Sequence, residues 1–242
     1  MQESKTVWSL IFLLLTGCAS SHEPDRTAMR ETLHVDPMPV AESQLLASQG
    51  VHLSTPLRLG IFFVNRDFPN GKSIRKVEWL TTDREQLLGK LAPLQNERLR
   101  VDAFVLMDAT LRGENIRGIR LAGARYGADL VLIVDGTASI GRYNNRYALL
   151  YPTLFGAYLA PGTECTALVM VTGGLWAVSS EWHAPIQTAE GVSRVVGSAV
   201  LVEDSTALRE AKERAIQALG MRIVDQLQLL AVEPSRAKHN SQ

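Results

Sequence analysis

The sequence is poor in cysteine and in net charge, and its N-terminal hydrophobic run is short. Its 242 residues include two cysteines, which excludes a disulfide framework and a zinc site with four sulfur ligands. Basic and acidic side chains both number 25, so the whole chain has no electrostatic drive toward nucleic acid or acidic lipid. An apolar fraction of 46% is ordinary for a globular protein, so we expect a folded core.

The N-terminus has the layout of a secretory signal. A polar lead with Lys5 precedes an apolar stretch at 7–15, far shorter than the roughly 20 residues of a permanent membrane-spanning helix. Small residues then lead to Cys18 and resemble the lipobox of bacterial lipoproteins. We therefore expect a signal peptide at 1–17, acyl chains that anchor Cys18 in a membrane and, because Ala19 follows the cysteine, sorting to the outer membrane.

The segment after Cys18 is expected to be a tether. Residues 18–56 are rich in polar side chains, and their prolines interrupt any long periodic pattern. We predict that the folded part is a single α/β domain over 57–232, followed by a polar tail at 233–242.

The first half of that domain alternates between strand-like and helix-like segments. Apolar runs of strand length occur at 57–64, 101–107 and 130–134, and helical spacing occurs at 82–94 and 115–126. Thr82 and Glu85 have capping-box spacing, and Gly127 stands where a helix needs a left-handed residue at its end. This β-α-β-α-β order predicts an α/β fold with a mixed sheet.

The second half predicts a β-hairpin extension and a long final helix. Residues 138–143 and 146–151 read as hairpin strands joined by Asn144-Asn145, which would place Arg142 opposite Tyr147 and Tyr143 opposite Arg146. Further strands are expected at 165–178 and 195–202. A helix from Asp204 or Ser205 to Leu230 is expected to pack on the sheet through one apolar stripe: Leu208, Ala211, Ala215, Leu219, Ile223, Leu227 and Leu230.

Few residues offer catalytic chemistry. His183 stands beside Glu181, but no serine or cysteine has a spacing that pairs with it. Four carboxylates lie at the ends of predicted strands, where they can serve either an active site or turns and caps: Asp102, Asp108, Asp129 and Asp135. Cys165 is expected to be a buried apolar residue or, alternatively, one half of an intermolecular disulfide. We expect no catalytic residue, no cofactor and no metal.

An aromatic segment is the best candidate for binding. All five tyrosines lie between Tyr126 and Tyr158, and residues 147–160 combine tyrosines with leucines and no carboxylate. The interface candidates are Tyr143, Tyr147, Tyr151, Phe155 and Tyr158. The segment at 142–162 is open to three interpretations: a buried connection, a surface for a protein partner or self-association, and a membrane contact.

Several short motifs in order resemble the rhombotarget lipoprotein family. They are the lipobox at Cys18, the segment 121–129, the stretch 147–162 ending in Ala-Pro-Gly, and residues 191–199 before the long helix. The resemblance implies an envelope that displays rhombosortase-processed proteins, and it assigns no catalytic residue. More distantly, the order of elements is similar to the periplasmic domain of the curli-secretion lipoprotein, which implies oligomerisation and a role in secretion.

Together these features predict a non-enzymatic lipoprotein of the outer membrane with its domain in the periplasm or at the cell surface. The expected role is binding or assembly in surface-protein export or envelope organisation. The partners would be the membrane, through the lipid on Cys18, and a protein or a second copy through 142–162, without nucleic acid. Two alternatives remain: an envelope hydrolase that uses His183 with strand-end carboxylates, and a purely structural self-associating lipoprotein.

Overall fold

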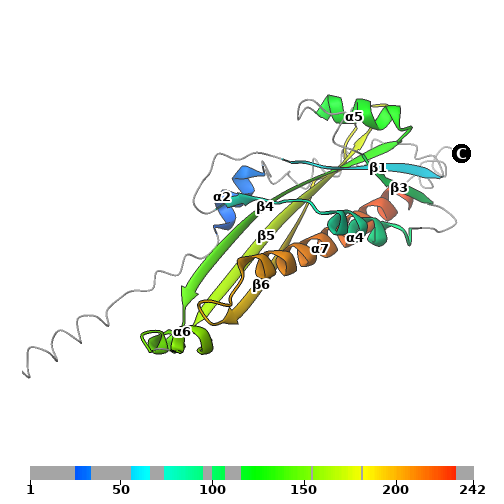
Figure 1. The fold of residues 1–242 in the computed structure, drawn as a ribbon. Coiled ribbons are helices and arrows are strands. Elements are labelled where there is room, and N and C mark those ends of the chain that lie inside the picture. Colours follow the sequence, from blue (N-terminus) through cyan, green and yellow to red (C-terminus); the bar gives the residue numbers. More distant parts are fainter. Residues whose placement is uncertain are drawn as a thin grey trace, which may run out of the picture.

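A computed structural model describes residues 25–33, 56–65, 74–94, 100–106, 116–153, 155–180 and 182–232, together with the backbone but not the side chains of 231 and 232. The predicted α/β class and mixed sheet are confirmed: a six-stranded sheet carries helices on both faces (Figure 1). The sites expected at Cys18, Asp108 and Glu181 fall outside the described residues, as do the signal peptide and the polar tail.

The sheet joins a parallel part to an antiparallel part in the order β3-β1-β4-β5-β6, with β2 paired beside β4. The strands are β1 (Leu57–Phe63), β2 (Ile74–Lys76), β3 (Val101–Val105), β4 (Leu130–Asn144), β5 (Thr163–Ala177) and β6 (Gln187–Gly197). Strand β1 lies parallel between β3 and β4, whereas β4, β5 and β6 form an antiparallel series.

Strand β4 connects the two parts. Residues 130–134 pair with β1, residues 137–139 pair with β2, and the other edge pairs with β5 over all fifteen residues. A strand of fifteen residues is roughly 50 Å long. The far halves of β4, β5 and β6 therefore extend beyond the parallel strands as an arm, which Figure 1 shows in green and yellow-green.

Helices α4 (Thr81–Leu91) and α7 (Asp204–Val232) cover one face of the sheet (Figure 1). The stripe predicted for the last helix is confirmed, because Ala211, Ala215, Leu219, Ile223 and Leu227 are fully buried against this face and Leu208 and Leu230 pack at its margins. The helix approaches β6 closely at Gly191, where a Cβ atom would lie 2.0 Å from the carbonyl oxygen of Ala211.

The opposite face carries α5 (Ile116–Arg125) over the parallel strands and α2 (Arg26–Thr32) over the arm. Helix α5 ends as predicted, with Gly127 at a φ of 68°. Helix α2 lies inside the predicted tether and corrects that prediction for residues 25–33. Its Met29 is fully buried against Leu168 and Met170 of β5, so the folded part includes this segment.

Three local predictions are corrected by the structure. The capping box predicted at Thr82 and Glu85 is replaced by Asp83, whose Oδ2 accepts the backbone N–H of Leu80 at 2.8 Å. The last strand runs over 187–197 rather than 195–202, because Val202 and Leu201 close a turn on the carbonyl oxygen of Ser198. The third correction, of the hairpin, concerns the candidate site.

Candidate binding surface at the end of the arm

The connection between β4 and β5 caps the free end of the arm. We call residues 145–162 the tip; it contains the 3₁₀ helix η2 (Arg146–Leu150) and the short helix α6 (Gly156–Leu159). The predicted hairpin is therefore wrong, because residues 146–151 do not form a strand and β4 pairs instead with β5, from Asn144 opposite Thr163 onward. The predicted pairs also fail, since Arg146 stacks on its neighbour Tyr147, with 5.0 Å from its guanidinium carbon to the ring centre.

Asn145 fastens both ends of the tip, and this explains why no tight turn forms. Its Oδ1 accepts the backbone N–H of Tyr147 at 2.9 Å and so caps η2, while its backbone stays extended. Its Nδ2 donates to the carbonyl oxygen of Pro161 at 2.9 Å and to Oε1 of Glu164 at 3.2 Å. One side chain thus joins the start of the connection to its end.

Two glycines allow the tip to fold tightly. A Cβ atom on Gly156 would lie 1.7 Å from the carbonyl oxygen of Leu150, and one on Gly162 would lie 2.5 Å from the backbone nitrogen of Ala148. Both obstacles are backbone atoms, which cannot swing away as a side chain can. The tip is therefore a closely packed cap rather than an extended loop.

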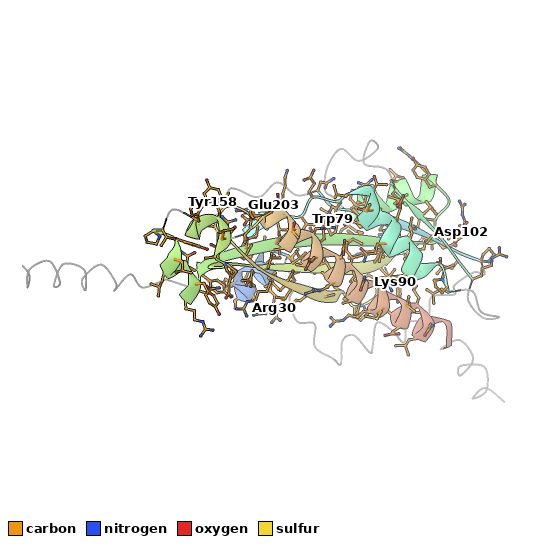
Figure 2. The ribbon with its side chains drawn as sticks, turned by 60° about the horizontal axis from the view of Figure 1, so that its bottom comes forward. Arg30, Trp79, Lys90, Asp102, Tyr158 and Glu203 are labelled. Carbon is orange, nitrogen blue, oxygen red and sulfur yellow. The ribbon has the colours of Figure 1, made fainter. Side chains whose placement is uncertain are left out.

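The tip exposes its apolar side chains to solvent. Six large ones have exposed fractions between 44% and 78%: Tyr147, Leu149, Leu150, Phe155, Tyr158 and Leu159. At the adjoining end of β6 and its exit turn, Val196, Val200 and Leu201 are exposed as well. Figure 2 shows Tyr158 at one end of the molecule and Asp102 near the other. Of the three interpretations of this segment, the buried connection is excluded for these side chains.

The five predicted interface residues divide into two groups. Tyr147, Phe155 and Tyr158 are exposed, whereas Tyr143 and Tyr151 are half-buried and support the tip from below. The hydroxyl of Tyr151 lies 2.6 Å from that of Thr163. Sequence reasoning named the aromatic residues but not the equally exposed leucines, although an apolar run without charge was a signal for both.

The base of the tip is a cluster of paired charges. The carboxylate of Glu164 is buried, bonded to Asn145 and paired with Arg194. A hydrogen bond from Tyr143, together with those from Asn145 and Arg194, holds the pKa of Glu164 below its usual range although burial opposes this. The same ion pair raises the pKa of Arg194. The base therefore stays fully ionised at neutral pH.

Cys165 lies behind this cluster and is fully buried. Burial, assisted by a hydrogen bond to Oδ1 of Asp204 at 3.4 Å, raises the pKa of its thiol to about 11. Arg142 neutralises Asp204 at 3.1 Å. Of the two expectations for Cys165, the structure supports the buried thiol, because a fully buried sulfur cannot meet a second chain.

The residues of the hydrolase alternative do not converge in the described part of the chain. His183 stacks on Trp176 of β5 with 4.5 Å between ring centres, whereas Asp102 lies on β3, three strands away or roughly 14 Å. Asp129 accepts the backbone N–H of Arg58 at 2.8 Å, and Asp135 accepts that of Gly136 at 2.8 Å. These two carboxylates therefore serve the backbone.

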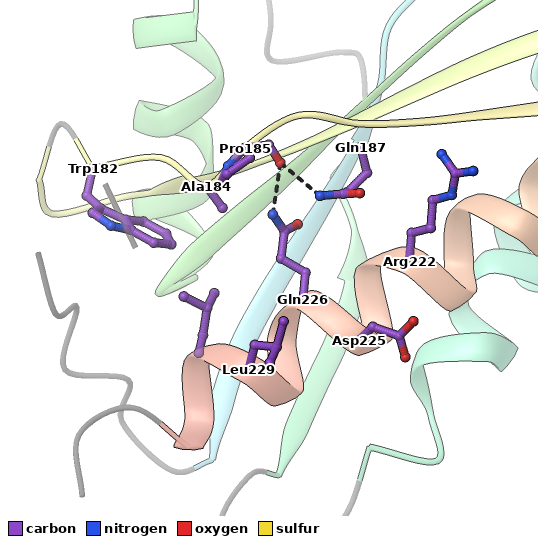
Figure 3. Close-up of a pocket in the computed structure, with 9 residues that line it drawn as sticks. Trp182, Ala184, Pro185, Gln187, Arg222, Asp225, Gln226 and Leu229 are labelled. Carbon is purple, nitrogen blue, oxygen red and sulfur yellow. Dashed lines mark hydrogen bonds between the residues drawn. The ribbon is translucent and has the colours of Figure 1, made fainter. Parts of the chain in front are cut away.

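A pocket of about 340 Å³ lies between the turn before β6 and the last turns of α7 (Figure 3). Its walls are Trp182, Ala184, Pro185, Gln187, Arg222, Asp225, Gln226, Leu229 and Leu230. Nε2 of Gln226 donates to the carbonyl oxygen of Pro185 at 2.8 Å, and this bond ties α7 to the turn. His183 is not among its lining residues, so the pocket does not bring the histidine and carboxylates together.

Two searches of the described residues complete the description of the site. No cluster of three or more histidine, cysteine, aspartate or glutamate side chains there has the arrangement of a metal site. No helix in that part of the chain is both long enough and apolar enough to cross a membrane.

Comparisons with known proteins give distant structural likenesses only. No family model and no curated protein matches the sequence. A neuraminyllactose-binding hemagglutinin homolog from Helicobacter pylori is similar in structure, with a TM-score of 0.40 and 13% identity over 77% of this chain and 94% of that one. A hypothetical protein from Chlamydia trachomatis aligns with a TM-score of 0.36 and 10% identity over 74% of this chain and 99% of its own.

Proposed function

We propose that the protein is a lipid-anchored component of a bacterial envelope that works by binding rather than by catalysis, with the tip as its contact surface. The anchor would be the acylated Cys18, in the outer membrane, with the domain in the periplasm. The signal-like N-terminus and its lipobox support the anchor, and the exposed tip supports the mode of action.

The observation that carries the proposal is the apolar surface of the tip. With roughly 200 Å² for each large side chain, the exposed fractions of its six residues amount to about 700 Å². The largest apolar patch of a typical monomer is about 300–600 Å². Asn145 and the two glycines hold these side chains on a packed cap, so their exposure is built into the fold.

The finer assignment, a role in surface-protein export or envelope organisation, rests on the sequence resemblance. Membership of the rhombotarget lipoprotein family, and the distant similarity to the curli-secretion lipoprotein, remain predictions from the motifs. Binding through the tip is compatible with either.

Site-specific photo-crosslinking in the native envelope tests the proposal. A photoreactive amino acid in place of Tyr158 should capture an envelope component, whether lipid or protein, whereas the same group in place of Leu121 on α5 should capture little. Leu121 is a matched control because its exposed fraction is 57% and that of Tyr158 is 58%. Equally low capture at both positions would refute the contact surface. Mass spectrometry of the N-terminal peptide tests the anchor separately, since an unmodified Cys18 would refute it.

A further inference from the structure

The chemistry of the tip distinguishes a lipid surface from a protein partner. Residues 145–162 contain one charged side chain, Arg146, and no carboxylate. Half of the six exposed side chains are leucines, which are under-represented at the energetic centres of protein interfaces. The others are tyrosine and phenylalanine, and tyrosine is enriched where a bilayer meets water. Leucine and aromatic residues together are typical of segments that enter the interfacial region of a membrane.

The charges at the base of the tip permit approach to a membrane. The buried carboxylate of Glu164 is paired with Arg194, and Asp204 is paired with Arg142 at 3.1 Å. These carboxylates therefore present little free negative charge to anionic headgroups. Arg146 lies at the start of the tip with its side chain against Tyr147, and there it can contact a headgroup phosphate.

The reach of the N-terminal chain places a lipid on Cys18 and the tip within range of one membrane. Seven peptide steps separate Cys18 from Asp25, the cap of α2, and they span roughly 25 Å at most. Helix α2 is fixed on the arm, because Met29 packs on Met170 and Arg26 pairs with Glu190 at 3.1 Å.

The tip begins a comparable distance along the same arm. Thr163, at its base, is seven residues from Met170 along β5, which corresponds to roughly 23 Å. The chain ahead of α2 is thus long enough for Cys18 to reach the level of the tip.

From these observations we infer that the tip inserts its exposed leucines and aromatic rings into the surface of a phospholipid bilayer, as a second attachment beside the lipid on Cys18. The inference rests on the proposed function, whose contact surface it identifies as a bilayer contact. Two weak membrane signals on one molecule reinforce each other, because the first holds the second at high local concentration.

Depth-dependent fluorescence quenching on the full, lipidated protein tests the inference. The protein would be reconstituted in vesicles of phosphatidylethanolamine with a minority of phosphatidylglycerol, some lipids carrying a nitroxide quencher. A thiol-reactive, polarity-sensitive dye would be attached through Leu159→Cys or, as the control, through Leu121→Cys on α5; both native side chains are exposed. Cys165 should not take up the dye, because it is fully buried.

We expect the dye at Leu159→Cys to be quenched and shifted to the blue, and the dye at Leu121→Cys to report water. Adding Leu149→Ser and Phe155→Ser should lower the ratio of inserted to free tips about tenfold or more, because each removes a large apolar side chain from the membrane. Adding Met221→Ser and Leu229→Ser instead, two exposed positions on α7, should leave that ratio unchanged.

Two outcomes would overturn the inference. One is equal exposure to water of both dyes. The other is shielding of the tip only at high protein density or after addition of envelope extract, which would make the occupant a second copy or another protein. A Cys18 without acyl chains would refute the anchor instead, and the same labelled proteins mixed with the vesicles would still test the tip.

Discussion

The ion pair between Lys212 and Asp83 should be the most costly exposed-to-buried charge to remove from this fold. Nζ of Lys212, on α7, lies 2.6 Å from Oδ2 of Asp83, on α4, and donates to the carbonyl oxygen of Glu78 at 2.8 Å. The two side chains are only 12% and 4% exposed, so water cannot replace either partner. Replacing Lys212 by methionine would leave a buried carboxylate whose remaining hydrogen bond comes from the N–H of Leu80.

Breaking a buried pair in this way costs about 3–5 kcal/mol. The matched control is Arg214→Met on the same helix, because Arg214 pairs with Glu210 at 3.7 Å and both are largely exposed. An exposed pair contributes less than about 1 kcal/mol. Urea denaturation followed by tryptophan fluorescence gives both free energies of unfolding.

A double-mutant cycle separates the pair from other effects of the substitution. Asp83→Asn removes the charge but keeps an oxygen for the N–H of Leu80, so the double variant should lose about 1–3 kcal/mol less than the sum of the single variants. Equal losses in Lys212→Met and Arg214→Met, or strict additivity in the cycle, would show that burial of the pair does not control its energy.

Two further predictions concern packing and pH. Gly191→Ala should destabilise the domain by about 1–3 kcal/mol, because its Cβ would overlap the backbone of α7, whereas Gly89→Ala, with no atom within 4 Å, should stabilise α4 by roughly 0.5–1 kcal/mol; denaturation midpoints that move in the same direction would contradict this. Because the folded state lowers the pKa of Glu164, its contribution to stability is complete above the ordinary value of 4.5 and is lost as the pH falls through the lower folded value. Glu164→Gln should therefore have a flatter stability profile than the parent below pH 4.5, and identical profiles would contradict the role given to the hydrogen bond from Tyr143.

The elements that the sequence predicted best have a long, clean period. The stripe of α7 repeats over more than six turns, and its alternation of small and large residues follows the close contact with the sheet. The strand at β1 was equally clear, because nearly every residue of it is buried. Such patterns depend on burial, and burial here is continuous along the whole element.

The misreadings have local physical causes. Residues 135–140 of β4 include buried polar groups at Asp135, Thr137 and Ser139, so the strand lost its apolar signature halfway along. Helix α2 has only seven residues and packs through Met29 and Leu33, too few for a periodic pattern. Each is decided by contacts with residues far away in the sequence.

The tip was located by composition but not by conformation. Two consecutive asparagines are typical of a tight turn, yet Asn145 uses its side chain to cap η2 and to bond Pro161 and Glu164. Both distant partners lie more than fifteen residues further on, and no short window shows them. Gly156 and Gly162 carried the only local sign of a compact cap.

The central place of β4 determines when the N-terminal half can fold. Strand β1 finds its neighbours at β3 and at β4, and β4 begins only at Leu130. Helix α2 packs on Leu168 and Met170, later still in the chain. A polypeptide delivered N-terminus first must therefore keep its first hundred or so residues unpaired until β5 emerges, open to chaperones and proteases alike. The antiparallel strands β4 and β5 are neighbours in sequence and can form first, so the arm is the natural template on which the rest of the domain assembles.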